Sequence, residues 1–142
     1  MEWKGSYQIK DLLNGDWILV DSIPEKNSVY VVSKSKWTEQ PSKEAEILYV
    51  GSNTGKSARF RTRVGDLIAD MFGLSCEETG HSSGGKSLNK YCREEKINPN
   101  ELFIGWEANC ECGRCEESRL YGEFHPSLNK NKPPVHEHTT TL

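Results

Sequence analysis

Two stretches decide the fold: Ser-Val-Tyr-Val-Val-Ser at residues 28–33 and Ile-Leu-Tyr-Val-Gly at residues 47–51. Both are rich in β-branched and aromatic residues, which suit a pleated, half-buried backbone, and the second ends abruptly at a glycine. A polar loop that contains Pro41 joins them. We therefore expect two neighbouring strands, each of which carries one tyrosine, Tyr30 or Tyr49.

A helix is expected after the second strand. Apolar residues recur there at the spacing of one helix face: Phe60, Val64, Leu67, Ile68 and Met71. Arg63 and Asp66 belong to the opposite face. This helix should therefore pack its apolar stripe on the sheet.

The second half of the chain predicts three further elements. A short helix is expected over residues 88–96, a third strand over residues 102–106, and a final helix from about Arg114 that stops before Pro126, because proline disfavours helix at the residue ahead of it. The resulting order predicts an α+β fold with a small central three-stranded antiparallel sheet flanked by helices.

The domain boundaries follow from the same pattern. Residues 1–27 carry a weak helical pattern and are expected to form an N-terminal extension packed on the domain of residues 28–132. Residues 133–142 lack a core pattern and are expected to be a flexible tail.

The composition places limits on the class of protein. The chain has 142 residues, which suits one domain, and 35% hydrophobic residues. It has neither an apolar run of membrane-spanning length nor a signal sequence, so we expect a cytoplasmic protein without a membrane partner. The net charge is −3, yet residues 52–69 contain four basic residues and one acidic residue. This segment should attract phosphate.

Five cysteines, an odd number, fit a reducing compartment better than a disulfide framework. Cys110, Cys112 and Cys115 are close enough in sequence to bind a structural zinc ion, since thiolates are soft ligands. The alternative is that Cys115 is a buried helix residue. A fourth zinc ligand would come from Cys76, Cys92 or His81; the pair His136 and His138 is a weaker candidate.

Glu117 is unusual because its position points a carboxylate inward. It lies on the same helical stripe as Leu120, Tyr121 and Phe124. An inward carboxylate is costly unless it is paired or binds a metal ion. A structural ion pair with an arginine is the alternative interpretation.

These motifs together resemble the GIY-YIG nuclease family, in particular its compact, restriction-enzyme-like members. Residues 28–30 (Ser-Val-Tyr) stand in the place of the first signature and residues 49–51 (Tyr-Val-Gly) in the place of the second. Glu117 opens a segment of the form E-x-x-L, and Pro126 and Asn129 follow at the spacing of the family.

The resemblance implies a metal-dependent DNA endonuclease with the GIY-YIG fold. Glu117 would hold one divalent cation, Mg²⁺ or Mn²⁺. Tyr30 would activate or position the attacking water, Tyr49 would orient the phosphate or water, and Asn129 would fix the geometry. DNA is the expected partner, and a homodimer would allow double-strand cuts.

The family also uses an arginine on the helix after the second signature. Counting directly from Gly51 gives Arg59, whereas matching the hydrophobic stripe gives Arg63, which we prefer. Further DNA contacts are expected from polar and basic residues near these motifs: Ser52, Lys56, Arg61, His81 and Lys86.

Two alternative functions remain. Residues 80–87 fit the phosphate-loop pattern G-x-x-x-x-G-K-S, but no buried apolar strand precedes them, which argues against an ATPase or GTPase. The other alternative is a catalytically idle nucleic-acid-binding module of the same fold.

Overall fold

The computed structural model describes residues 2–13, 23–24, 28–52, 60–73, 83–107 and 112–129. The expected tail, residues 133–142, lies outside these ranges. None of the described helices combines the length and the apolar character that a membrane span requires. The elements, in chain order, are β1 (Trp3–Gln8), α1 (Ile9–Leu13), β2 (Val29–Ser33), the 3₁₀ helix η1 (Lys43–Ala45), β3 (Ile47–Ser52), α3 (Phe60–Met71), α4 (Ser83–Glu95), the 3₁₀ helix η2 (Pro99–Glu101), β4 (Phe103–Glu107) and α5 (Gly113–Phe124).

The chain forms an α+β fold around an antiparallel sheet with the strand order β1-β4-β2-β3. The sheet described here has four strands, so the expected count of three is corrected. The additional strand is β1, which pairs with β4. Its sequence, Trp-Lys-Gly-Ser-Tyr-Gln, has only two large apolar side chains, Trp3 and Tyr7, and its register shifts between Lys4 and Tyr7. The hydrophobic periodicity therefore did not predict β1, which joins the sheet through backbone pairing with the edge of β4.

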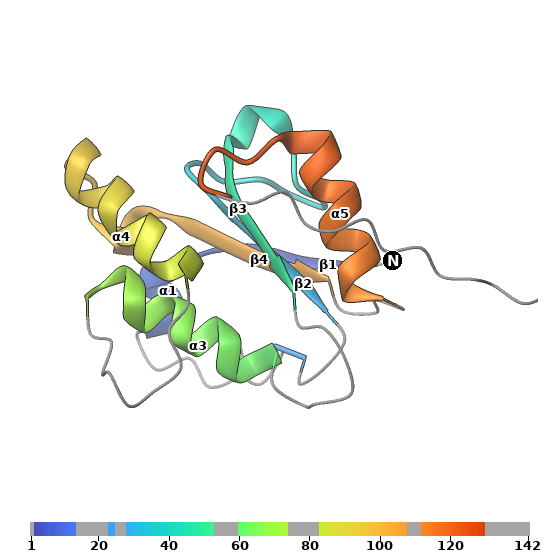
Figure 1. Ribbon diagram of the computed structural model, residues 1–142, viewed down its shortest axis with the longest axis horizontal. Coiled ribbons are helices and arrows are strands. Elements are labelled where there is room, and N and C mark those ends of the chain that lie inside the picture. Colours follow the sequence, from blue (N-terminus) through green and yellow to red (C-terminus); the bar gives the residue numbers. More distant parts are fainter. Residues whose placement is uncertain are drawn as a thin grey trace, which may run out of the picture.

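Helices cover both faces of the sheet (Figure 1). On one face, α1, α3 and α4 pack with strand residues such as Val32, Ile104 and Trp106 into the larger core cluster. On the other face, α5 packs through Leu120 against a second cluster that includes Val31. The alternation of side chains along each strand thus produces two cores separated by the sheet.

Helix α4 begins at Ser83, earlier than the expected start near Leu88. Gly84 and Gly85 made this segment resemble a loop, because glycine is a poor helix former. In the structure they allow close packing instead. A Cβ atom on Gly85 would overlap the side chain of Asp70 and lie 2.7 Å from the carbonyl oxygen of Leu67, both in α3. This packing explains why residue 85 is a glycine without invoking a phosphate loop.

Trp37 fixes the loop after β2 against the sheet. Its side chain is 2% exposed and lies over Gly105, where a Cβ atom would overlap the indole ring. Ser6 of β1 holds the backbone of Trp37, because the Ser6 amide donates to the Trp37 carbonyl (3.1 Å) and the Trp37 amide donates to the Ser6 hydroxyl (2.9 Å). The missing side chain in β4 is therefore what admits the indole.

Replacing Gly105 with alanine should destabilise the protein by about 1–3 kcal/mol, since the methyl group would overpack a buried ring. The matched control is Gly122→Ala in α5, where a Cβ atom meets no atom within 4 Å. That substitution should stabilise the protein by up to about 1 kcal/mol, the helix-propensity difference. Urea unfolding measures both, and a Gly105→Ala protein as stable as the parent would contradict this packing.

Candidate functional site

The two tyrosines of the expected signatures lie side by side on neighbouring strands. Tyr30 of β2 pairs directly with Gly51 of β3, and a Cβ atom on Gly51 would overlap the Tyr30 ring. The ring centroids of Tyr30 and Tyr49 are 6.1 Å apart with an interplanar angle of 31°. The glycine of the second signature is thus needed because the tyrosine of the first lies over it.

Tyr49 reaches from β3 to the start of α4. Its ring lies against Gly84, where a Cβ atom would overlap it. Tyr49 is half-buried, whereas Tyr30 is only 5% exposed. Of the two tyrosines, Tyr49 is therefore the more accessible to a bound molecule.

Glu117 of α5 meets the end of β3. The hydroxyl of Ser52, the last residue of β3, donates a hydrogen bond of 2.6 Å to Glu117 Oε2. Both side chains are half-buried, and one turn further along α5 Leu120 is 2% exposed, so Glu117 lies on the inward stripe of the helix. We call Tyr30, Tyr49, Ser52 and Glu117 the β3-end site. Within it, the two tyrosines lie on the α3 and α4 face of the sheet, and Ser52 and Glu117 lie on the α5 face.

Asn129 joins the segment after α5 to the free edge of β3. Its Oδ1 atom accepts from the Val50 amide (3.0 Å) and its Nδ2 atom donates to the Val50 carbonyl (2.9 Å). The amide of Leu128 also donates to the Leu48 carbonyl (2.9 Å). Both polar atoms of the Asn129 side chain are therefore hydrogen-bonded to the backbone of β3, as expected for a residue that positions this strand.

The expected basic residues are only partly placed. The backbone of Arg63 lies in the first turn of α3, while the side chains of Arg61 and Arg63 lie outside the described part of the chain. The expected residues Lys56, Arg59 and His81 also lie outside it. Lys86 is exposed near the start of α4.

The three cysteines that the structure describes lie on different faces of the sheet. Cys112 is the N-cap of α5, and its sulfur accepts from the Cys115 amide at 3.4 Å. Cys92 is buried in α4 on the other face of the sheet, where burial raises the pKa of its thiol. Among the described residues, no group of three His, Cys, Asp or Glu side chains is arranged to hold a metal ion. Cys76, Cys110 and His81, and the pair His136 and His138, lie outside the described ranges.

Glu107 is a buried acid that the sequence analysis did not single out. It ends β4 with 0% exposure, and the described residues offer its carboxylate oxygens no N–H donor; the neighbouring polar group is the carboxyl of Glu116. Burial raises its pKa to about 7, the negative charge of Glu116 adds to this effect, and Arg119 opposes it. The sequence held one signal for this position. Residues two apart in a strand share a face, so Glu107 lies on the same face of the sheet as Gly105, which α5 covers.

A comparison with family models, with curated proteins and with solved structures gave no match for this chain. The residues and their geometry are therefore the basis for assigning a function.

The raised pKa of Glu107 predicts that stability depends on pH. Its folded-state pKa of about 7 exceeds the ordinary value of 4.5, so the folded protein keeps a proton that the unfolded chain releases. The free energy of unfolding should therefore fall as pH rises from about 4.5 to about 7. Glu107→Gln should flatten this dependence and, near pH 8, be more stable than the parent by up to about 3 kcal/mol.

Urea unfolding at several pH values tests this expectation. Glu123→Gln is the control, because Glu123 is exposed on α5 and its replacement removes the same charge. A parent protein whose stability is constant across this interval, or a Glu107→Gln variant with the parent's pH profile, would rule out the assignment.

Proposed function

We propose that this chain is a metal-dependent DNA endonuclease of the GIY-YIG type that hydrolyses phosphodiester bonds. The observation that carries the proposal is the hydrogen bond between Ser52 and Glu117. This hydrogen bond joins β3, the strand of the second tyrosine signature, to α5, the helix that contains the E-x-x-L segment. Ser52 and Glu117 are 65 positions apart in the sequence. The resemblance assigns both motifs to one active site, and this contact holds the Glu117 carboxylate at the end of the strand that carries Tyr49.

Glu117 fits the role of ligand to a hard cation. It offers carboxylate oxygens, which Mg²⁺ and Mn²⁺ prefer, and its half-buried position limits competition from water. The Ser52 hydroxyl would fix the orientation of this carboxylate, as outer hydrogen-bond partners of metal ligands do. A cation bound there would neutralise charge near the scissile phosphate and the leaving oxygen.

The tyrosines would act on the phosphate and the attacking water. Tyr49, the more accessible ring, would orient the phosphate at the point where β3 meets the start of α4. Tyr30 would position or activate the water through its hydroxyl above Gly51. Since the ordinary pKa of tyrosine is roughly 10, accepting a proton would require neighbouring positive charge. An arginine at the start of α3 would supply it and stabilise the charge on the phosphate.

Replacing Glu117 with glutamine should abolish Mg²⁺-dependent nicking of a supercoiled plasmid while the protein stays folded. Glutamine keeps an oxygen acceptor for Ser52 but removes the charge that holds a hard cation. The matched control is Glu123→Gln, an exposed position on the same helix, which should cut at the parental rate.

A third variant, Ser52→Ala, tests the positioning role. It should lower nicking by about 10- to 100-fold and raise the Mg²⁺ concentration needed for half-maximal rate. A folded Glu117→Gln protein that nicks at the parental rate would exclude the proposed metal ligand. A parent protein that binds DNA but never nicks it would instead indicate an idle binding module.

The arginine is tested by two single substitutions measured in parallel. Arg63→Ala should reduce nicking by on the order of a hundredfold, because a guanidinium that stabilises transition-state charge is lost. Arg59→Ala should have a smaller effect, and circular dichroism should show both variants folded. The reverse ranking would move the catalytic role to Arg59.

A further inference from the structure

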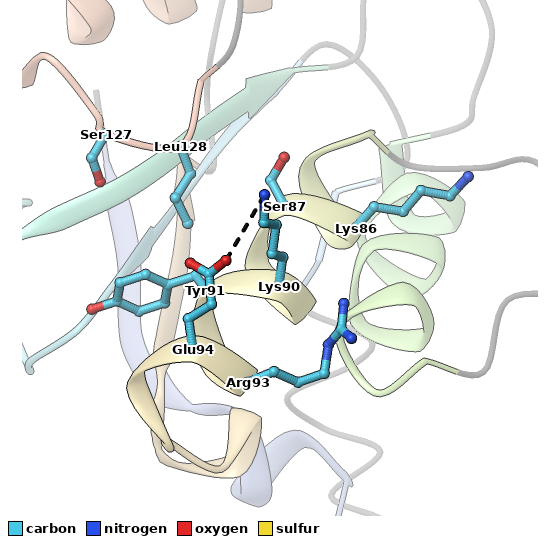
Figure 2. Close-up of a pocket in the computed structure, with 8 residues that line it drawn as sticks. All are labelled: Lys86, Ser87, Lys90, Tyr91, Arg93, Glu94, Ser127 and Leu128. Carbon is cyan, nitrogen blue, oxygen red and sulfur yellow. Dashed lines mark ion pairs between the residues drawn. The ribbon is translucent and has the colours of Figure 1, made fainter.

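A pocket of about 440 Å³ opens beside α4, outside the β3-end site (Figure 2). One wall is the outer side of α4, and the other is the segment that follows α5. The lining residues that matter here are Lys86, Lys90, Tyr91, Arg93, Ser127 and Leu128.

The α4 wall of this pocket is positively charged. Lys86, Lys90 and Arg93 follow one another at i, i+4 and i+7, which places them on one side of the helix, and all three are exposed. Figure 2 shows Lys86 and Arg93 extending to the same side, with Lys90 nearer to Leu128. The pocket lining therefore offers three cations to an anionic ligand.

Glu94 is the carboxylate in the same lining. It pairs with Lys90 at 3.8 Å, and both side chains are well exposed, at 64% and 71%. An exposed ion pair of this kind contributes little stability. Lys90 can therefore exchange Glu94 for a phosphate oxygen at small cost.

Helix α4 contributes to both the pocket and the surroundings of Tyr49. Helix α4 starts at the Tyr49 ring, against which Gly84 packs, and Lys86 follows two residues later. The opposite wall includes Leu128, whose amide binds the Leu48 carbonyl of β3. Residues two apart on a helix point in nearly opposite directions, so the row of cations lies on the exposed side of α4, and Gly84 and Tyr49 lie on its buried side.

The length of the row matches a nucleic-acid strand. Seven residues of α-helix separate Lys86 from Arg93, which corresponds to roughly 10 Å. Successive charges of one DNA strand are about 3.4 Å apart along the helix axis, so this distance spans about three phosphates.

We propose that this pocket binds the sugar-phosphate backbone of the DNA strand that flanks the cleavage site. Lys86, Lys90 and Arg93 contact successive phosphates of that strand. This inference rests on the proposed endonuclease function and extends it to the path of the substrate. Phosphate contacts carry no sequence information, so the pocket orients the duplex without selecting a sequence.

The test measures binding of a fluorescent DNA duplex to the full chain by anisotropy, in the Glu117→Gln background to prevent cutting. Salt is varied from about 50 to about 200 mM. The variant Lys90→Gln/Arg93→Gln should weaken binding at least about tenfold. It should also reduce the magnitude of the slope of log K against log salt by about two, because each lost phosphate contact accounts for about one. The control Lys34→Gln/Lys36→Gln makes the same charge change at exposed positions after β2 and should leave both quantities unchanged.

A gain-of-affinity variant separates contact from damage to the fold. Glu94→Gln should tighten DNA binding by roughly threefold, because it frees Lys90 and removes a charge that repels phosphate. Weaker or unaltered binding by this variant would count against the pocket.

The outcomes distinguish this inference from the endonuclease proposal. If the parent nicks plasmid but Lys90→Gln/Arg93→Gln keeps the parental affinity and salt slope, the pocket is refuted and the endonuclease stands. If the double variant loses binding while the parent never nicks, the pocket stands and the endonuclease fails. Polyglutamate that displaces DNA at equal charge concentration would overturn the pocket's assignment to DNA.

Discussion

The bidentate bond between Asn129 and the backbone of Val50 determines where the parts of the site lie. Val50 stands between Tyr49 and Gly51, so holding it on both its amide and its carbonyl fixes β3 relative to the chain that leaves α5. The strand held in this way ends at Ser52, which donates to Glu117 of α5. It also covers part of the free edge of β3, which would otherwise present unpaired backbone groups.

Two glycines, which have no side chain, allow the tyrosine rings of the β3-end site to pack closely against the backbone. Tyr30 lies over Gly51, and Tyr49 lies against Gly84. Each contact lets a large ring approach backbone that any other residue would hold away. Gly84 lies in the first turn of α4, so Tyr49 packs against the helix whose exposed side carries Lys86, Lys90 and Arg93. Catalysis and substrate binding, as proposed, thus depend on the same helix.

Several elements follow from the sequence because their patterns are strong. Strands β2 and β3 and helices α3 and α5 fall within a few residues of their expected bounds, since β-branched runs and a 3.6-residue stripe are local signals. Strand β1 was missed, because its pairing depends on the edge of β4 and not on its own alternation. The early start of α4 was also missed, because the tight contact with α3 overrides the poor helix propensity of glycine.

The candidate site was predictable to a similar degree. The sequence indicated Glu117 as an inward carboxylate. Its hydrogen bond with Ser52 joins residues far apart in the chain, so the spacing of the motifs could not predict this pairing. Glu107 escaped notice because a single glutamate at a strand end is ordinary in sequence. Its lack of N–H donors among the described residues is a property of the folded layer beneath α5.

The central claim is that Glu117 holds a divalent cation in the β3-end site. Diffraction from a crystal soaked in Mn²⁺, recorded where manganese scatters anomalously, tests it most directly. We expect an anomalous peak about 2.0–2.3 Å from a Glu117 carboxylate oxygen, with Ser52 still hydrogen-bonded to the same side chain. Manganese bound elsewhere, with the carboxylate of Glu117 contacting only protein, would contradict it.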